Sequence, residues 1–191
     1  MATKNASRPL PRRSFAGLKF FCQCALLNAA FLQSTANVLA QGTSSREYQI
    51  KAAYLYNFIK YIDWPSSKDT ITIGIFGENP FGSALAPLNG KTAKGRRVVI
   101  KQLDSLRDAD NCQVIFVSSS EKQRLRDIFE NATAEHVLTV GEVEGFAQSG
   151  GIINFIEENN KVHFEINAEA ARRTGLTISS ELLKLAKLVK S

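Results

Sequence analysis

The sequence has few of the side chains that most often carry out chemistry. Only 2 of its 191 residues are His and only 3 are Cys. Neither His136 nor His163 has a partner ligand at the spacing that zinc sites use. The nucleophile motif Gly-x-Ser-x-Gly is absent, and the glycines near Gly77 match neither the dinucleotide-binding fingerprint nor the phosphate loop. The sequence therefore predicts no metal, no cofactor and no enzymatic activity.

Positive charge is also scarce outside the N-terminal region. The chain has a formal net charge of +6, but five of its 24 Lys and Arg residues lie in the first forty, where there is no Asp or Glu. The remaining chain is close to neutral, and neutral domains lack the basic surface that binds phosphate backbones. This pattern excludes nucleic acid as the expected partner.

Residues 1–40 have the three parts of a secretory leader. A basic stretch ends at Lys19, an apolar stretch spans Phe20–Leu32, and Val38-Leu39-Ala40 fits a signal-peptidase site. The alternative is an uncleaved membrane anchor, but a bilayer span needs about 20 residues. We expect residues 1–40 to be a cleaved signal peptide and residues 41–191 to be a periplasmic domain.

Cleavage would leave Cys112 as the single thiol, because Cys22 and Cys24 belong to the leader. One cysteine cannot form an internal disulfide. Cys112 stands beside the apolar run Val114–Val117, so the sequence predicts that it is buried and unreactive.

Hydrophobic periodicity predicts alternating helices and strands in the mature chain. A helix over Arg46–Asp63 has an apolar face that includes Ile50, Tyr54, Leu55, Phe58, Ile59, Tyr61 and Ile62. Strands are predicted at Thr70–Gly77, Val98–Leu103, Gln113–Ser118, Val137–Val140, Ile152–Ile156 and Val162–Ile166.

Shorter elements follow from turn and capping signals. Asn79–Leu88 suggests a short helix, and Ser120 with Gln123 resembles a capping box that starts another. Asn159-Asn160 predicts a hairpin between the last two strands. Asn167 is expected to cap a short helix that Gly175 ends, and a final helix from Ser179 is expected to bury Leu182, Leu185, Ala186 and Val189.

Together these elements predict one α/β domain. Its mixed sheet would have about five to six strands flanked by helices, with a C-terminal hairpin and helices.

The region after the hairpin has the composition of a contact surface. Small side chains at Ala168 and Ala171 allow another surface to come close, and Arg172 and Arg173 can bind carboxylates in a bidentate way. Together with Glu165, these residues are our candidate partner-binding site. The alternative is a solvated helix whose alanines pack on the sheet.

Several stretches resemble the YfiR family of periplasmic proteins. They are Lys51–Phe58 with Trp64-Pro65, Gly150–Phe155, Val162–Asn167 and Gly175–Ala186. The resemblance implies a repressor that binds the periplasmic part of an inner-membrane diguanylate cyclase and lowers cyclic di-GMP and biofilm formation. It further implies sequestration by an outer-membrane OmpA-like lipoprotein and a homodimeric state.

Two features qualify what the resemblance implies. Relatives with disulfide-forming cysteine pairs differ from this chain, in which Cys112 has no partner.

The alternative function is a periplasmic small-molecule sensor for another membrane receptor, such as a hybrid histidine kinase. Repression itself requires no chemistry, since a protein that binds an inactive conformation better shifts the population toward it.

Overall fold

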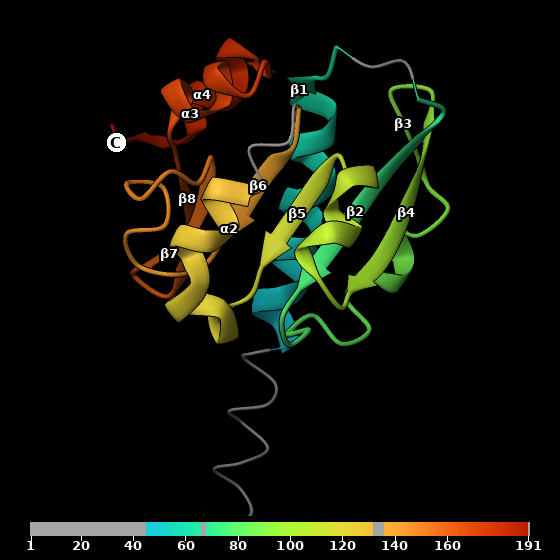
Figure 1. The fold of residues 1–191 in the computed structure, drawn as a ribbon, viewed down its shortest axis with the longest axis horizontal. Coiled ribbons are helices and arrows are strands. Elements are labelled where there is room, and N and C mark those ends of the chain that lie inside the picture. Colours follow the sequence, from blue (N-terminus) through green and yellow to red (C-terminus); the bar gives the residue numbers. More distant parts are fainter. Residues whose placement is uncertain (1–44, 66–67, 132–135, 191) are drawn as a thin grey trace, which may run out of the picture. The chain divides into compact units, whose positions relative to one another are not determined.

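The computed structural model describes residues 45–65, 68–131 and 136–190. The predicted signal peptide lies outside these residues. The described part is the predicted single α/β domain, in which a helix over residues 45–61 crosses one face of a mixed sheet (Figure 1). None of the helices described is long and apolar enough to cross a membrane.

Within the described residues, the main sheet has eight strands in the order β10-β8-β7-β6-β5-β2-β4-β3. The strands are β2 (Thr70–Phe76), β3 (Thr92–Ala93), β4 (Arg96–Leu103), β5 (Val114–Val117), β6 (Leu138–Gly141), β7 (Ile153–Glu158), β8 (Lys161–Ile166) and β10 (Lys187–Leu188). A separate two-stranded sheet joins β1 (Ile62–Asp63) to β9 (Thr177–Ile178). All six predicted strands are present, and the additional strands are two residues long.

The central strands β4, β2, β5, β6 and β7 are parallel, whereas β8 runs antiparallel to β7. Both faces of this parallel region are covered, so every residue of β5 and β6 is buried. Strands that are buried on both faces have continuous apolar sequences rather than alternating apolar and polar residues.

Two hydrophobic clusters fill the space on either side of the sheet. The first lies beneath the N-terminal helix and includes Leu55, Phe58 and Ile59. The second includes Ile128 and Phe146. Several short helices follow the strands: η1 (Ala86–Leu88), η2 (Leu106–Asn111), η3 (Ser119–Arg124), α2 (Leu125–Asn131), α3 (Ala168–Arg173) and α4 (Ser180–Leu185).

The buried face of the N-terminal helix is narrower than the sequence predicts. Ile50 and Tyr61 are 40% and 42% exposed, so their assignment to the inner face is wrong. Lys51 is buried instead. The helix ends at residue 61, and the indole Nε1 of Trp64 donates to the Gln113 carbonyl oxygen over 3.2 Å.

The hairpin between β7 and β8 is confirmed. Asn159 and Asn160 form its two-residue loop with φ of 52° and 58°. Two consecutive positive φ values define the type I′ turn, and Asn tolerates this conformation better than most residues do. Cys112 is also buried as predicted, and it is the free cysteine of the described chain.

Three local predictions are wrong. Asn79–Leu88 forms turns and the single 3-10 turn η1, because the Asn79 Oδ1 accepts from the Phe81 N–H and Gly82 adopts φ of 52°. Ser118, rather than Ser120, caps the segment before α2. α4 ends at Leu185, which is 70% exposed, because the chain turns there into β10.

Candidate functional site

The Gly150-Gly151 pair makes a close backbone approach beneath α3. A Cβ on Gly151 would lie 2.2 Å from Cε1 of Phe146, and a Cβ on Gly141 would lie 2.5 Å from Cδ2 of the same ring. Gly150 adopts φ of 119°, which other residues rarely reach. Gly141 and Gly151 therefore let Phe146 pack between two backbone segments, at the loop that leads into β7.

Asn167 fixes the start of α3, as the sequence predicts. Its Oδ1 accepts from the Ala170 N–H over 2.9 Å, while its Nδ2 donates to the Ala147 carbonyl oxygen over 2.8 Å. Asn167 is fully buried, and its backbone N–H donates to the Ile152 carbonyl oxygen. The cap thus joins α3 to the 142–151 loop, and α3 ends before Gly175 with φ of 75°.

The five candidate partner-binding residues divide into two groups. Ala168, Arg172 and Arg173 are exposed, whereas Glu165 and Ala171 are 5% and 1% exposed. Arg173 Nη1 lies 3.5 Å from Glu169 Oε1 one helical turn earlier. The structure does not test partner binding, but only the first group is available to a partner at the surface.

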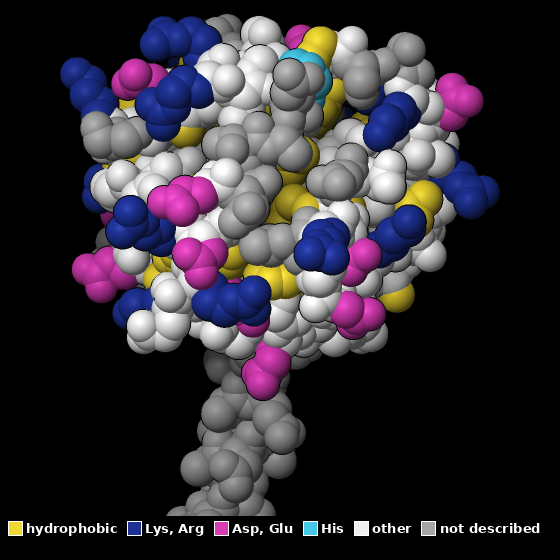
Figure 2. Space-filling model, in the orientation of Figure 1, with side chains coloured by type: hydrophobic (Ala, Val, Ile, Leu, Met, Phe, Trp, Pro, Cys, Tyr) yellow, Lys and Arg dark blue, Asp and Glu magenta, His cyan; other side chains and the backbone are white. Residues whose placement is uncertain are grey.

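Basic side chains surround the exposed group. Figure 2 shows Lys and Arg side chains gathered over α3 and α4, at the upper left. Arg172, Arg173, Lys184 and Lys190 are exposed in this region, together with the acidic Glu169 and Glu181. Below, we call Ala168, Arg172 and Arg173 with these lysines the basic surface.

A groove of about 340 Å³ runs beside the basic surface. Phe129 and Glu130 of α2 line it on one side, and Ala170 and Arg173 of α3 line it on the other. Its lining combines an aromatic side chain with both signs of charge.

The Glu165 side chain lies on the sheet face opposite that of Phe164, and its contacts are separate from those of the basic surface. It is paired with Asn154 in the neighbouring strand, and Asn154 Nδ2 donates to its Oε1 over 3.1 Å. Gln148 Nε2 lies 3.5 Å from its Oε2. Glu165 was a candidate from the sequence, whereas Asn154 was not, although Asn154 lies in the family-like stretch Gly150–Phe155 and opposite Glu165 in the predicted hairpin.

Lys51 forms a buried polar cluster that the sequence did not reveal. Its Nζ lies 2.7 Å from Glu142 Oε2 and 2.6 Å from Glu47 Oε1, and 4.6 Å from the centre of the Tyr48 ring. The Tyr48 hydroxyl donates to Glu142, and burial together with this carboxylate raises the pKa of Tyr48. Lys51 supplies the counter-charge of Glu142, so the cluster joins the N-terminal helix to the loop after β6 without an unpaired buried charge.

The described part of the chain offers no group of three or more His, Cys, Asp or Glu side chains arranged to hold a metal ion. Cys112 is buried beneath β2, and this burial raises the pKa of its thiol. A buried thiol with a raised pKa is a poor nucleophile. Cys112 is therefore poorly placed to act as a nucleophile.

Two solved structures share this fold. One is a conserved domain protein from Vibrio cholerae, with a TM-score of 0.51 and 14% identity over 75% of this chain. The other is an ABC domain from Streptococcus pneumoniae in complex with L-Trp, with a TM-score of 0.50 and 12% identity over 70% of this chain. The matches cover 60% and 59% of those two proteins. At this identity they establish the α/β fold alone.

A family model described as YfiR/HmsC-like matches residues 48–187. The match begins at Tyr48 in the buried polar cluster and ends at Lys187 in β10, so it includes both Asn154 and the basic surface up to α4. Proteins of this family are regulatory and periplasmic. The chain belongs to the YfiR/HmsC-like family.

Proposed function

We propose that this protein is a periplasmic repressor that binds the periplasmic part of an inner-membrane diguanylate cyclase. Binding the inactive conformation of the cyclase more tightly than the active one lowers cyclic di-GMP and biofilm formation. The observation that carries this proposal is the family match over residues 48–187.

The basic surface is the contact that we assign to the cyclase. Ala168 offers little steric bulk, so a partner backbone can approach α3 closely. Arg172 and Arg173 present planar donor groups that pair with carboxylates. Buried Ala171 and the Asn167 cap hold the helix in place, so the arginines stand on a supported element rather than on a free loop.

An outer-membrane OmpA-like lipoprotein is the proposed antagonist. By sequestering the repressor it would leave the cyclase active, since one molecule of repressor cannot serve two competing partners at the same surface. We further propose that the protein acts as a homodimer.

A pull-down with the periplasmic domain of the cyclase encoded nearest to this protein's gene tests the proposal. The mature protein should retain the domain, and the double variant Arg172→Glu/Arg173→Glu should lose most of the binding. A lost interfacial ion pair typically costs about 2–5 kcal/mol. Its melting temperature should stay close to that of the wild type, because exposed charges usually change stability by less than about 0.5 kcal/mol.

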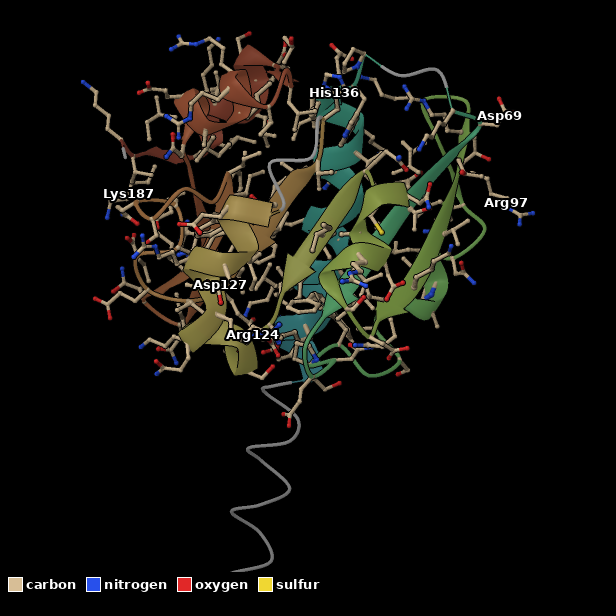
Figure 3. All side chains as sticks on the ribbon, viewed as in Figure 1. Asp69, Arg97, Arg124, Asp127, His136 and Lys187 are labelled. Atoms are coloured by element: carbon tan, nitrogen blue, oxygen red, sulfur yellow. The ribbon has the colours of Figure 1, made fainter. Side chains whose placement is uncertain are left out.

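The matched control reverses two exposed charges on β4, in Arg97→Glu/Lys101→Glu. Five strands separate β4 from β10 in the sheet, and Figure 3 shows Arg97 and Lys187 on opposite sides of the domain. This control changes the net charge equally but should bind normally. Full binding by the α3 variant places the interface elsewhere, and no retention of the cyclase domain by the wild type contradicts the proposed function itself.

A further inference from the structure

The carboxyl ends of β6 and β7 border an acidic cleft of about 440 Å³. The 142–148 loop, the end of β7, β8 and β10 line it. Five of its lining side chains are carboxylates, from Glu142, Glu144, Glu157, Glu158 and Glu165, and Lys187 is its basic residue. Open α/β sheets commonly bind ligands at the carboxyl ends of their parallel strands.

Glu165, the most buried of these glutamates, has no ion-pair partner among the residues that the structure describes. Glu165 is 5% exposed and receives hydrogen bonds from the amides of Asn154 and Gln148. No cation of the described chain lies within 4.0 Å of it, whereas Glu142 is paired with Lys51 and Glu158 with Lys187. Burying a carboxylate without a cation is costly, so a cationic occupant would stabilise this site.

Asn154 supplies a second and independent indication of a ligand. It is 1% exposed, lines the cleft, and its Oδ1 has no hydrogen-bond partner. The orientation of the amide follows from Glu165, because a carboxylate accepts and so requires Nδ2 on its side. An acceptor is therefore left unsatisfied beside an uncompensated anion, and buried polar atoms of native proteins rarely lack a partner.

Both groups accept hydrogen bonds, so the missing partner must be a donor, and the charge of Glu165 favours a cation. No three His, Cys, Asp or Glu side chains of the described residues are arranged to hold a metal ion, so the cation that we propose is organic. An ammonium group fits, because it carries three donors and one positive charge.

We propose that the cleft binds a small organic cation with at least one primary ammonium group. One ammonium donates to the Glu165 carboxylate beside the Asn154 amide, and a second positive group on the same molecule pairs with the exposed carboxylates of Glu144 and Glu157 at the rim. A volume of about 440 Å³ is in the range of small-ligand sites. The ligand class is that of polyamines and basic amino acids.

Isothermal titration calorimetry of the mature protein with spermidine, L-lysine and L-arginine tests the proposal, with 1,6-hexanediol and MgCl₂ as neutral and inorganic comparisons. At least one organic cation should bind saturably with one site per chain, and hexanediol should not bind. Affinity should fall with rising salt, because the contacts are charged. Equal binding of Mg²⁺ and the amines would show a diffuse counter-ion effect and would overturn the proposal.

Two variants locate the site. Glu165→Gln preserves the shape of the side chain and should weaken binding at least tenfold, whereas Glu181→Gln removes an exposed carboxylate outside the cleft and should bind as the wild type does. If Glu165→Gln folds poorly, the side-chain amide resonances of Asn154 in the wild type decide instead: they should shift on titration. Unchanged affinity in a folded Glu165→Gln variant, or unmoved Asn154 resonances, contradicts the assignment. The cyclase plays no part in these measurements, so their outcome is independent of the proposed function.

Discussion

Lys51 and Glu142 form an ion pair that joins the N-terminal helix to the loop after β6, with 2.7 Å between Nζ and Oε2. The two residues stand 91 positions apart in the sequence, and their side chains are 8% and 6% exposed. Lys51 belongs to the first motif by which the chain resembles its family. The contact therefore explains why a lysine stands at a position that helical periodicity would assign to the core.

Replacing Lys51 with Met should destabilise the protein by about 3–5 kcal/mol, because Glu142 would remain buried without its partner. Urea unfolding followed by circular dichroism measures this change. The double variant Lys51→Met/Glu142→Leu should be closer to the wild type, since two apolar groups replace the pair. Arg126→Met removes the solvent-exposed pair with Glu130 and should change the stability much less than Lys51→Met does. A Lys51→Met variant as stable as Arg126→Met would mean that the buried pair contributes little.

Tyr48 should make the stability of the protein fall at alkaline pH. Burial, and then the negative charge of Glu142, raise the pKa of this phenol above its unfolded value of about 10. The folded state therefore binds this proton more tightly than the unfolded state does. The resulting contribution to the free energy of unfolding is complete below about pH 10 and decreases as the pH rises further. Unfolding midpoints of the wild type and Tyr48→Phe between pH 8 and 11 check this. The Phe variant should show the shallower decline, and parallel curves would contradict the assignment.

Gly151→Ala should destabilise the protein by about 1–3 kcal/mol, the usual cost of overpacking a core. The added Cβ would lie 2.2 Å from Cε1 of Phe146, and Phe146 is fully buried. In a Phe146→Ala background the same glycine change should cost less, because the ring that it strikes is gone. A double-mutant cycle by thermal unfolding measures this coupling. Equal costs in the two backgrounds would locate the strain in the backbone rather than at the ring.

Cys112 should react slowly with iodoacetamide in the native protein and quickly after unfolding. The thiol is 3% exposed, and burial raises its pKa, so little thiolate is present or accessible. Mass spectrometry at timed intervals with and without urea follows the reaction. Rapid labelling of the native protein would show that the strand start at β5 opens readily.

Many local features of this protein follow from the sequence alone. The continuous apolar runs predict β5 and β6, because strands buried on both faces are apolar throughout. Asn159-Asn160 predicts the hairpin loop, because Asn tolerates the positive φ that this turn requires. Asn167 and Ser179 predict the starts of α3 and α4, since an N-cap needs only a side chain that reaches a backbone N–H three residues on. Short-range rules failed at Asn79–Leu88, where the Asn79 side chain bonds the backbone and competes with a helix.

The sequence by itself therefore determined where the main strands lie along the chain, where the capped helices begin, and the family, because each depends on neighbouring residues or on whole motifs. Only the tertiary structure decided which polar side chains meet. Lys51 finds Glu142 through the packing of a helix on a sheet, and the paired strands β7 and β8 set Asn154 against Glu165 at the floor of an acidic cleft. These contacts join residues far apart in the chain, and the free energy that selects them is that of burying the whole core.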